Sequence, residues 1–255
     1  QLAGGDGNDI LTGLSGNDEF WGGNGNDILL GGGGTDTAYY YGLRASYSLI
    51  TQGGILKLRV ADNQPNVDGD DGSDQLSSIE RLSFSGGETV NVSSPIILDL
   101  DGNGVRTVSA ADANARYDLD GDGLADDTSW IGNTEGFLFL DRDGNGTVSN
   151  AGEFSFIDDA EGARSDLEGL RAFDSNRDGI LSSLDARFSE FRVWQDKDGD
   201  GAAESGEILT LTSAGVRSIT LTGTAVDGTT DFGDVAVINQ GSYTRTNGTT
   251  MGFVD

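Results

Sequence analysis

The stretch GGDGNDILT-GLSGNDEFW-GGNGNDILL-GGGGTDTAY, residues 4–39, decides the fold of the first part of this chain. Each block of nine residues follows the pattern G-G-x-G-x-D-x-U-x, in which U is apolar. The glycine-rich start of a block predicts a turn and its end a short strand, so that successive blocks stack into a parallel β-roll. A flexible linker of similar composition would need neither a periodic aspartate nor a periodic apolar residue.

The repeat places one apolar and one acidic side chain at fixed positions. The apolar residues, which we expect to point into the core, are Leu11, Phe20, Leu29 and Ala38. The acidic residues are Asp9, Asp18, Asp27 and Asp36. Because alternate turns stack on the same edge of a roll, we expect Asp9 to share a metal ion with Asp27, and Asp18 with Asp36. Backbone carbonyls of the glycine-rich turns would complete each site.

A second spacing recurs after residue 95: Asp, then Asp or Asn at the third and fifth positions, then Gly. Its five copies begin at Asp99, Asp118, Asp141, Asp174 and Asp196. Alternate side-chain oxygens on a tight loop converge on one hard cation, and the glycine makes the sharp turn, as in an EF-hand-type calcium loop. For any single copy the alternative is an Asx-rich turn without an ion. Five copies within about a hundred residues favour calcium.

Two of these loops have nearly complete predicted ligand sets. The first consists of Asp174, Asn176, Asp178, the carbonyl of Ile180, Ser182 directly or through water, and Asp185. The second consists of Asp196, Asp198, Asp200, the carbonyl of Ala202, Glu204 and Glu207. We expect helices on both sides of the Asp174 loop, from the helical spacing of Leu167, Leu170 and Phe173 and of Leu184, Phe188 and Phe191. A short β bridge between Leu181 and Ala203 would pair the two loops.

The other three loops lack a carboxylate at the twelfth position. Their candidate metal ligands are Asp99, Asp101 and Asn103; Asp118, Asp120, Asp122 and Asp126; and Asp141, Asp143, Asn145 and Glu153. In the Asp99 loop Ala110 stands at the twelfth position, and in the Asp141 loop Glu153 comes one residue late. Three outcomes are open for such loops: binding with shifted geometry, sharing of ligands, or a ligand supplied from elsewhere in the chain.

The composition excludes several classes of function. The chain has 43 Asp and Glu residues against 15 Lys and Arg, a formal charge of -28, so nucleic acid and anionic membranes are not expected partners. It contains no Cys and no His, which excludes disulfides, thiol catalysis, His-based triads and ordinary zinc sites. No apolar run approaches membrane-spanning length. Self-repulsion of this size should destabilise the compact state unless several calcium ions offset it.

The sequence predicts three parts: the β-roll in residues 1–38, a β cap in residues 39–93, and a calcium-binding module in residues 94–255. Aromatic and β-branched runs between residues 39 and 92 predict the cap, with Gly53-Gly54 as a hairpin turn. Further strands are expected at residues 216–222, 234–239 and 242–246. The predicted fold class is mixed, mainly β with short helices: a parallel β-roll with a β cap, then an α+β module built around EF-hand-like calcium loops.

With their nonapeptides, residues 4–92 resemble the β-roll of the RTX (repeat-in-toxin) proteins and its trailing segment. Residues 94–255 resemble the self-processing module of the RTX iron-regulated, clip-and-link proteins. This second resemblance is carried by SPIILDLDGNGV, DLDGDGLADDTSW, EGFLFLDRDGNGTVSNAGEF, AFDSNRDGILSSLDARFSEFRVWQDKDGDGAAESGE and GSYTRTNG. It implies export through a type I channel, folding outside the cell on meeting calcium, and a secreted or cell-surface location.

The resemblance also implies a reaction that this chain lacks the residue to perform. The family module cleaves an Asp-Pro bond at its own N-terminus: the Asp carboxylate attacks its own carbonyl, and a lysine amine captures the resulting anhydride. Here the matching pair is Ser94-Pro95, and the chain has no Asp-Pro bond. A serine forms no anhydride, so we expect no catalytic residue and no self-cleavage.

The favoured function is therefore a calcium-binding structural module of a secreted bacterial RTX protein, serving as a surface or adhesin element. The alternatives are a calcium-triggered self-processing protease-ligase and a glycan-binding adhesin or surface-layer module. In the latter, Trp21, Trp130, Trp194 and the Tyr39–Tyr41 cluster would stack on sugars. Expected partners are calcium, cell-surface or matrix components, and further copies of the chain. Carboxylate pairs also suggest a glycosidase, but the metal loops account for nearly all of them.

Overall fold

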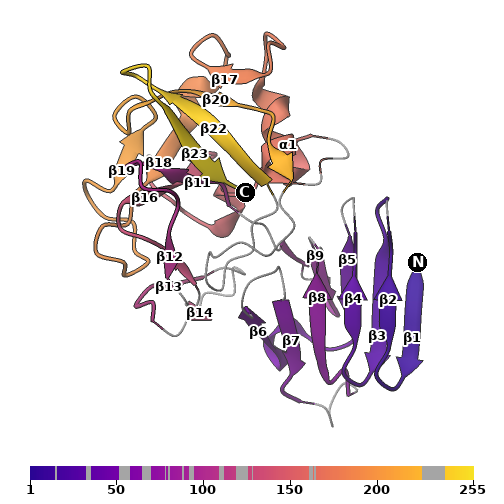
Figure 1. Ribbon diagram of the computed structural model, residues 1–255. Helices are drawn as coiled ribbons and strands as arrows, with labels where there is room; N and C mark the ends of the chain where they lie inside the picture. Colours follow the sequence, from indigo (N-terminus) through magenta and orange to yellow (C-terminus); the bar gives the residue numbers. More distant parts are fainter. Residues whose placement is uncertain are drawn as a thin grey trace. The chain divides into compact units, whose positions relative to one another are not determined.

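The chain folds as two compact units, Gln1–Val92 and Ser93–Asp255 (Figure 1). The structure, a computed structural model, describes residues 1–14, 16–32, 36–51, 58–64, 70–77, 79, 81–87, 89–91, 95–108, 112–118, 126–127, 129–160, 163, 165–225 and 239–255. Within these residues, no helix combines the length and the apolar character needed to cross a membrane.

The first unit is made of short strands and one 3-10 turn. Its elements are β1 (Leu2–Asp6), β2 (Ile10–Thr12), β3 (Glu19–Asn24), β4 (Ile28–Leu30), β5 (Thr37–Tyr40), η1 (Arg44–Ser46), β6 (Tyr47–Thr51), β7 (Leu58–Asp62), β8 (Ser73–Ser77), β9 (Arg81–Phe84) and β10 (Thr89–Asn91). One sheet has the strand order β1-β3-β5-β9-β10, and the other β2-β4-β8-β7-β6. Consecutive strands of the repeat thus alternate between two sheets, which is the winding of a β-roll.

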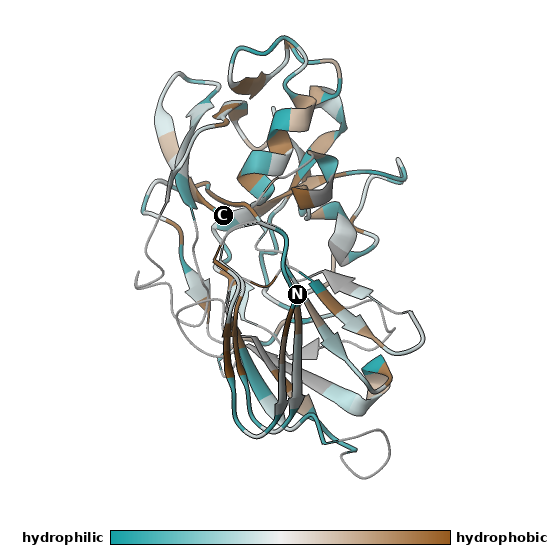
Figure 2. Ribbon diagram, turned by 90° about the vertical axis from the view of Figure 1, so that its right-hand side faces the viewer, coloured by the Kyte–Doolittle hydropathy of each residue, from teal (hydrophilic) through white to brown (hydrophobic). Residues whose placement is uncertain are grey.

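The periodic apolar residues of the repeat form the core of this unit. Phe20, Leu29 and Ala38 are buried together with Leu76 and Leu82, and Leu11 packs against them. Figure 2 shows brown segments on the strands of the roll and teal at its turns. The parallel ladder continues past residue 38, because β8 pairs with β4 and β9 with β5. Strand β7 pairs antiparallel with β8, and β6 pairs antiparallel with β7, so the two strands extend this sheet. The predicted turn at Gly53-Gly54 lies outside the described residues.

The second unit contains most of the chain. Its elements are β11 (Ile97–Asp99), β12 (Thr107–Val108), β13 (Arg116–Tyr117), β14 (Asp126–Asp127), β15 (Trp130–Ile131), β16 (Glu135–Leu140), η2 (Ala151–Glu153), η3 (Ile157–Asp159), α1 (Asp166–Gly169), η4 (Leu170–Phe173), β17 (Ile180–Ser182), η5 (Phe188–Glu190), β18 (Phe191–Trp194), β19 (Ile208–Thr210), β20 (Val216–Thr220), β21 (Thr224–Ala225), β22 (Asn239–Arg245) and β23 (Thr250–Val254).

One antiparallel sheet organises this unit, with strand order β17-β20-β22-β23-β11-β16-β18-β19 and β21 beside β22. Both faces of its central strands are buried. Along β16, Leu138 and Leu140 enter one hydrophobic cluster while Phe137 and Phe139 enter another. Because side chains alternate across a strand, β16 reads as a continuous apolar run opened by a single acidic residue, Glu135. Glu135 is thus the first residue of a strand that pairs with β11 on one side and β18 on the other.

The structure corrects the helical expectations. The α-helix in the described part of this unit is α1, four residues long, and it runs into the 3-10 turn η4. After the loop that ends at Asp185, the chain forms the 3-10 turn η5 and then β18 instead of an α-helix, and Leu184 is 76% exposed. Leu181 pairs with Ile219, so the expected bridge from Leu181 to Ala203 is wrong. The module is therefore mainly β and not α+β; residues 234–238 of one expected strand lie outside the described residues.

Candidate metal centres

The aspartates of the nonapeptides form two columns along the roll. The backbone N–H of Asp9 donates to Asp27 Oδ1 at 2.8 Å, and that of Asp18 donates to Asp36 Oδ1 at 2.7 Å. Each pair is separated by 18 residues, that is, by two repeats. The structure thus brings together the same two pairs that the repeat length predicts, and one oxygen of each acceptor carboxylate is held by the neighbouring turn.

The second carboxylate oxygen of these aspartates, Oδ2, lies in a tight, buried space between turns. For Asp9, Asp18 and Asp27, Oδ2 is buried and meets no hydrogen-bond donor among the described residues. A Cβ at Gly4 would lie 2.6 Å from both Asp9 Oδ2 and the carbonyl oxygen of Gly22. Only glycine fits there, and its absence of a side chain leaves the two oxygens side by side. A buried carboxylate oxygen that lacks a donor and lies near a carbonyl oxygen suits a hard cation such as calcium.

In the second unit, four described loops share one backbone construction. The aspartate that opens each loop accepts a hydrogen bond from the N–H of the glycine at the sixth position, at 2.8–3.3 Å: Asp99 from Gly104, Asp141 from Gly146, Asp174 from Gly179 and Asp196 from Gly201. All four glycines have positive φ, between 79° and 87°. This conformation is open to glycine at little cost, so the loop can close on its first carboxylate.

The carboxylate that closes three of these loops is also held alike. Glu207 accepts from the N–H groups of Lys197 and Glu204, which are the second and ninth residues of its loop. Asp185 accepts from Ser175 and Ser182, and Glu153 from Arg142 and Ser149, at the same two loop positions. Glu153, although one residue late in the sequence, therefore occupies the same place as the other two.

Hydrogen bonding sets the charge state of a closing carboxylate. Burial acts to raise the pKa of Asp185, but N–H donors from Ser182, Asn176 and Ser175 outweigh it and bring the pKa below its usual range. A carboxylate held in this way is ionised at neutral pH and ready to bind a cation without deprotonation.

Oxygen atoms of several acidic side chains converge within 4.8 Å of one another. The groups are Asp99, Asp101 and Glu135; Asp141, Asp143 and Glu153; Asp196, Asp198 and Glu207; and Asp198, Asp200 and Glu204. The side-chain N–H of Asn145 donates to Asp143, the third residue of the same loop. The side-chain N–H of Asn176 donates to Asp178, the fifth residue of its loop. Ile180 opens β17, and Ala202 donates its N–H to Asp200.

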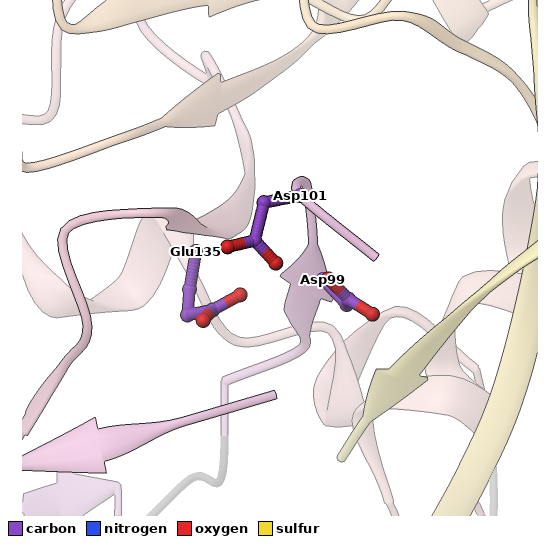
Figure 3. A group of neighbouring side chains, drawn as sticks. All are labelled: Asp99, Asp101 and Glu135. Atoms are coloured by element: carbon purple, nitrogen blue, oxygen red, sulfur yellow. The ribbon is translucent and has the colours of Figure 1, made fainter. Parts of the chain in front are cut away.

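Glu135 brings a carboxylate to the Asp99 loop, which has none of its own at the closing position. It comes from β16 and faces Asp99 across the β11–β16 pair. Figure 3 shows the carboxylates of Asp101 and Glu135 turned toward each other, with Asp99 at the end of its strand beside them. Tyr243 and Arg245 of β22 bond to the carbonyl oxygens of Asp99 and Leu100, which holds the start of the loop in place.

Glu135 is fully buried, and its Oε2 has no hydrogen-bond partner among the described residues. Burial is the main cause that raises its pKa to about 7. The hydrogen bond from Thr134 is the next largest effect and lowers the pKa, the charges of Asp99 and Asp101 raise it, and Arg106 lowers it. At 4.8 Å, two carboxylates repel by about 3 kcal/mol at an effective dielectric constant of about 20. The exposed Arg106, 3.5 Å from Asp101, contributes at most about 1 kcal/mol. A divalent cation would remove this imbalance.

Two tryptophans hydrogen-bond to candidate metal ligands, and the sugar-stacking expectation for them is wrong. Trp130 and Trp194 are 4% and 0% exposed. The indole N–H of Trp130 donates to Asp196 Oδ2 at 2.7 Å, and that of Trp194 reaches Glu207 Oε2 at 3.5 Å. Trp21 stacks on Tyr39 with ring centroids 4.4 Å apart, Tyr40 is buried, and Tyr41 is exposed.

The Asp118 loop stands apart from the others. Asp118 is half-buried, and the backbone of Asp126 pairs with Tyr117. Asp120 and Asp122 lie outside the described residues.

The Asp99 loop also contains Asn103. Its backbone and side-chain N–H groups both donate to Asp101, so Asn103 belongs to the Asp99 site.

Sequence reasoning missed Glu135 because it lies 36 residues beyond Asp99, outside any loop spacing. One signal for it was present: an acidic residue opens the otherwise apolar run EGFLFL, and buried acids are rare unless they are paired or bind metal.

The loop glycines provide a mutational test of this construction. Gly201→Ala should destabilise the chain by about 3 kcal/mol, since its Cβ would lie 2.6 Å from the Arg116 carbonyl and φ is +82°. Gly146→Ala has a similar φ, +80°, but open space around the added atom, so about 1 kcal/mol is expected. Urea unfolding of both variants in calcium measures the difference. Equal losses would mean that the Arg116 contact is absent.

Comparison with known proteins agrees with these two kinds of site. The RTX calcium-binding nonapeptide repeat, in four copies, matches residues 3–38. The SPM domain matches residues 96–255. The iron-regulated protein FrpA of Neisseria meningitidis serogroup C is 36% identical over 170 residues, which cover 65% of this chain and 15% of that protein.

Calcium is therefore the metal of this chain, because RTX nonapeptide repeats bind calcium. The acidic groups of the second unit offer further places for metal ions. With an SPM domain over more than half of its length and RTX repeats ahead of it, the chain belongs to the family of RTX proteins that carry an SPM domain.

Proposed function

We propose that this chain is a calcium-binding structural module of a secreted bacterial RTX protein, and that it folds when calcium binds after type I export. The observation that carries the proposal is Glu135, a fully buried carboxylate facing Asp99 and Asp101 with an oxygen that lacks a partner among the described residues. Such an arrangement is costly in a metal-free fold and favourable around a divalent cation.

In this proposal the roll binds calcium through the pairs Asp9–Asp27 and Asp18–Asp36. The loops opened by Asp99, Asp141, Asp174 and Asp196 are EF-hand-like sites that use the ligands converging in each. Glu135 takes the closing position of the first loop, and Glu153, Asp185 and Glu207 take it in the others. The formal charge of -28 supports the same conclusion, because a chain with this self-repulsion has little tendency to collapse until cations bind.

The location of folding follows from calcium affinity. EF-hand-type loops in extracellular modules bind at about 10⁻⁴–10⁻³ M, far above the calcium concentration inside a cell. A chain of this kind stays extended during export and becomes rigid outside, where it serves as a surface or adhesin element. The whole parent protein's activity and partners extend beyond this module, since the chain spans 15% of the relative that it matches. The test is a calcium titration of the metal-free chain followed by circular dichroism.

The second candidate function is calcium-triggered self-processing, which is favoured by the SPM match alone. It requires an Asp before Pro95, and the sequence has Ser94. We expect the wild-type chain to keep its intact mass of 26.5 kDa after prolonged incubation in millimolar calcium. Mass spectrometry before and after calcium measures this result.

The variant Ser94→Asp restores the Asp-Pro bond, with Ser94→Ala as its control. If the missing Asp alone silences processing, Ser94→Asp releases a fragment that ends at residue 94 in calcium, and Ser94→Ala stays intact. A calcium-dependent fragment from the wild-type chain would contradict the structural role proposed here and favour processing.

A further inference from the structure

Residues 69–77 repeat the nonapeptide pattern after an interruption. They read GDDGSDQLS, which matches G-G-x-G-x-D-x-U-x except for Asp70 at the second position. The family comparison places its four copies at residues 3–38, so this stretch lies 30 residues beyond the last of them. The intervening chain contains the antiparallel strands β6 and β7.

Strand β8 occupies the place of the next strand in the roll. Ile28, Leu29 and Leu30 of β4 pair with Gln75, Leu76 and Ser77 in parallel. This is the register in which β2 pairs with β4 one step earlier. Leu76 stands at the apolar position of the repeat and is buried in the core of the roll.

The contacts of the preceding aspartate pair recur around Asp74. The N–H of Asp27 donates to Asp74 Oδ1 at 2.8 Å, as the N–H of Asp9 does to Asp27 Oδ1. The N–H of Gln75 donates to the Asp27 carbonyl at 2.8 Å, as that of Ile28 does to the Asp9 carbonyl at 2.9 Å. Gly72, with φ +66°, packs against the Gly25 carbonyl, as Gly25 packs against that of Gly7.

The new pair also contains a buried oxygen that lacks a donor. Asp27 and Asp74 are each 1% exposed, and Asp27 Oδ2 meets no donor among the described residues. In the pair Asp9–Asp27, the corresponding Oδ2 is that of Asp9, the upstream member, so Asp27 Oδ2 belongs to the pair with Asp74. Buried Asp71 adds negative charge nearby, and it accepts hydrogen bonds from the Tyr41 N–H and the Tyr47 hydroxyl.

We propose that residues 70–77 form a fifth turn of the roll and that Asp27 and Asp74 hold an additional calcium ion there. The ion would fasten β8 to the roll, and with β8 the inserted strands β7 and β6 that pair along its edge. Calcium would then decide whether the inserted hairpin is docked. This inference rests on the proposed calcium-binding role and adds one site to it.

The test counts calcium ions in the full chain by equilibrium dialysis at 1 mM calcium. Asp74→Asn keeps an acceptor oxygen for the Asp27 N–H but removes the charge, and it should bind one ion fewer than the wild type. Asp27→Asn, which belongs to two pairs, should bind two fewer. The matched control is Asp70→Asn, an exposed aspartate of the same loop, which should bind as many ions as the wild type.

Hydrogen exchange adds a second measurement. The Asp62 N–H of β7 donates to the Gly72 carbonyl at 2.8 Å, and its exchange in calcium should rise at least tenfold in Asp74→Asn while exchange in the second unit stays unchanged. If Asp74→Asn does not fold, Asp74→Glu, which keeps the charge on a longer side chain, should bind the wild-type number of ions with weaker affinity at one site.

The outcomes separate this inference from the proposed function. An ion count and exchange rate in Asp74→Asn equal to those of the wild type would overturn the fifth-turn site and leave the calcium-binding role intact. A wild-type chain that binds no calcium would overturn both. Wild-type affinity in Asp74→Glu at every site would also contradict a site at Asp74.

Discussion

Removal of calcium is expected to unfold most of this chain at neutral pH and moderate ionic strength. Each ion bound only by the folded state contributes about 2.7 kcal/mol when free calcium is a hundredfold above its dissociation constant. Four such ions contribute about 11 kcal/mol, which is comparable to the whole stability of a typical domain, about 5–15 kcal/mol. The loss of the ions also restores the repulsion of a chain with formal charge -28.

Circular dichroism and small-angle scattering measure this transition. Without calcium we expect a spectrum without strand signal and a radius of gyration near 55 Å, the value for an unfolded chain of 255 residues. Millimolar calcium should restore the strand signal and shrink the chain severalfold. Magnesium at equal concentration and added potassium chloride are the controls, because they supply charge screening without calcium's ligand geometry. An unchanged spectrum after chelation would refute calcium-dependent folding.

Glu135→Gln is expected to have opposite effects on stability with and without calcium. The pKa of Glu135 in the folded state is about 7, above its ordinary 4.5, so the folded state holds the proton more tightly than the unfolded chain. This stabilisation is fully present below about pH 4.5 and is lost as the pH rises through about 7. Gln imitates the protonated form, and at pH 8 it should stabilise the calcium-free fold by about 2 kcal/mol.

In calcium the same substitution removes a ligand, so stability should fall instead of rise. The calcium-free measurement uses trimethylamine N-oxide, an osmolyte that favours the compact state, and the midpoint osmolyte concentration should decrease for Glu135→Gln. In millimolar calcium the urea midpoint should decrease. Glu190→Gln is the control, because Glu190 is an exposed partner of Arg187 and either effect should stay within about 0.5 kcal/mol. A shift of the same sign in both conditions would place Glu135 outside a metal site.

The features that could be predicted from sequence are those formed by neighbours along the chain or by an unbroken repeat. A nonapeptide period requires the Asp9–Asp27 pairing once the chain winds, because each strand is positioned by the one two repeats earlier. The Asp-Gly loops likewise close on contacts within a few residues, such as Asp174 with Gly179. Such contacts depend on local backbone geometry, which glycine at positive φ supplies.

The helices failed as predictions because apolar spacing in short segments is ambiguous. Leu184 and Phe188 fit a helical period, but Leu184 is exposed and the chain reaches β18 within a few residues. The segment instead leads into β18, which begins at Phe191 and pairs there with Leu140 of β16. Backbone pairing with a distant strand outweighed the weak local preference.

The sequence by itself determined which residues repeat, where the chain turns, that calcium is the metal, and which carboxylates open each loop. Only the tertiary structure decided which distant residues join the candidate sites. Glu135 reaches Asp99 through the β11–β16 register, and Asp74 reaches Asp27 across an inserted hairpin. The physical reason is that strand register brings together residues whose separation in sequence carries no periodic signal, and burial then makes their charges dependent on a cation.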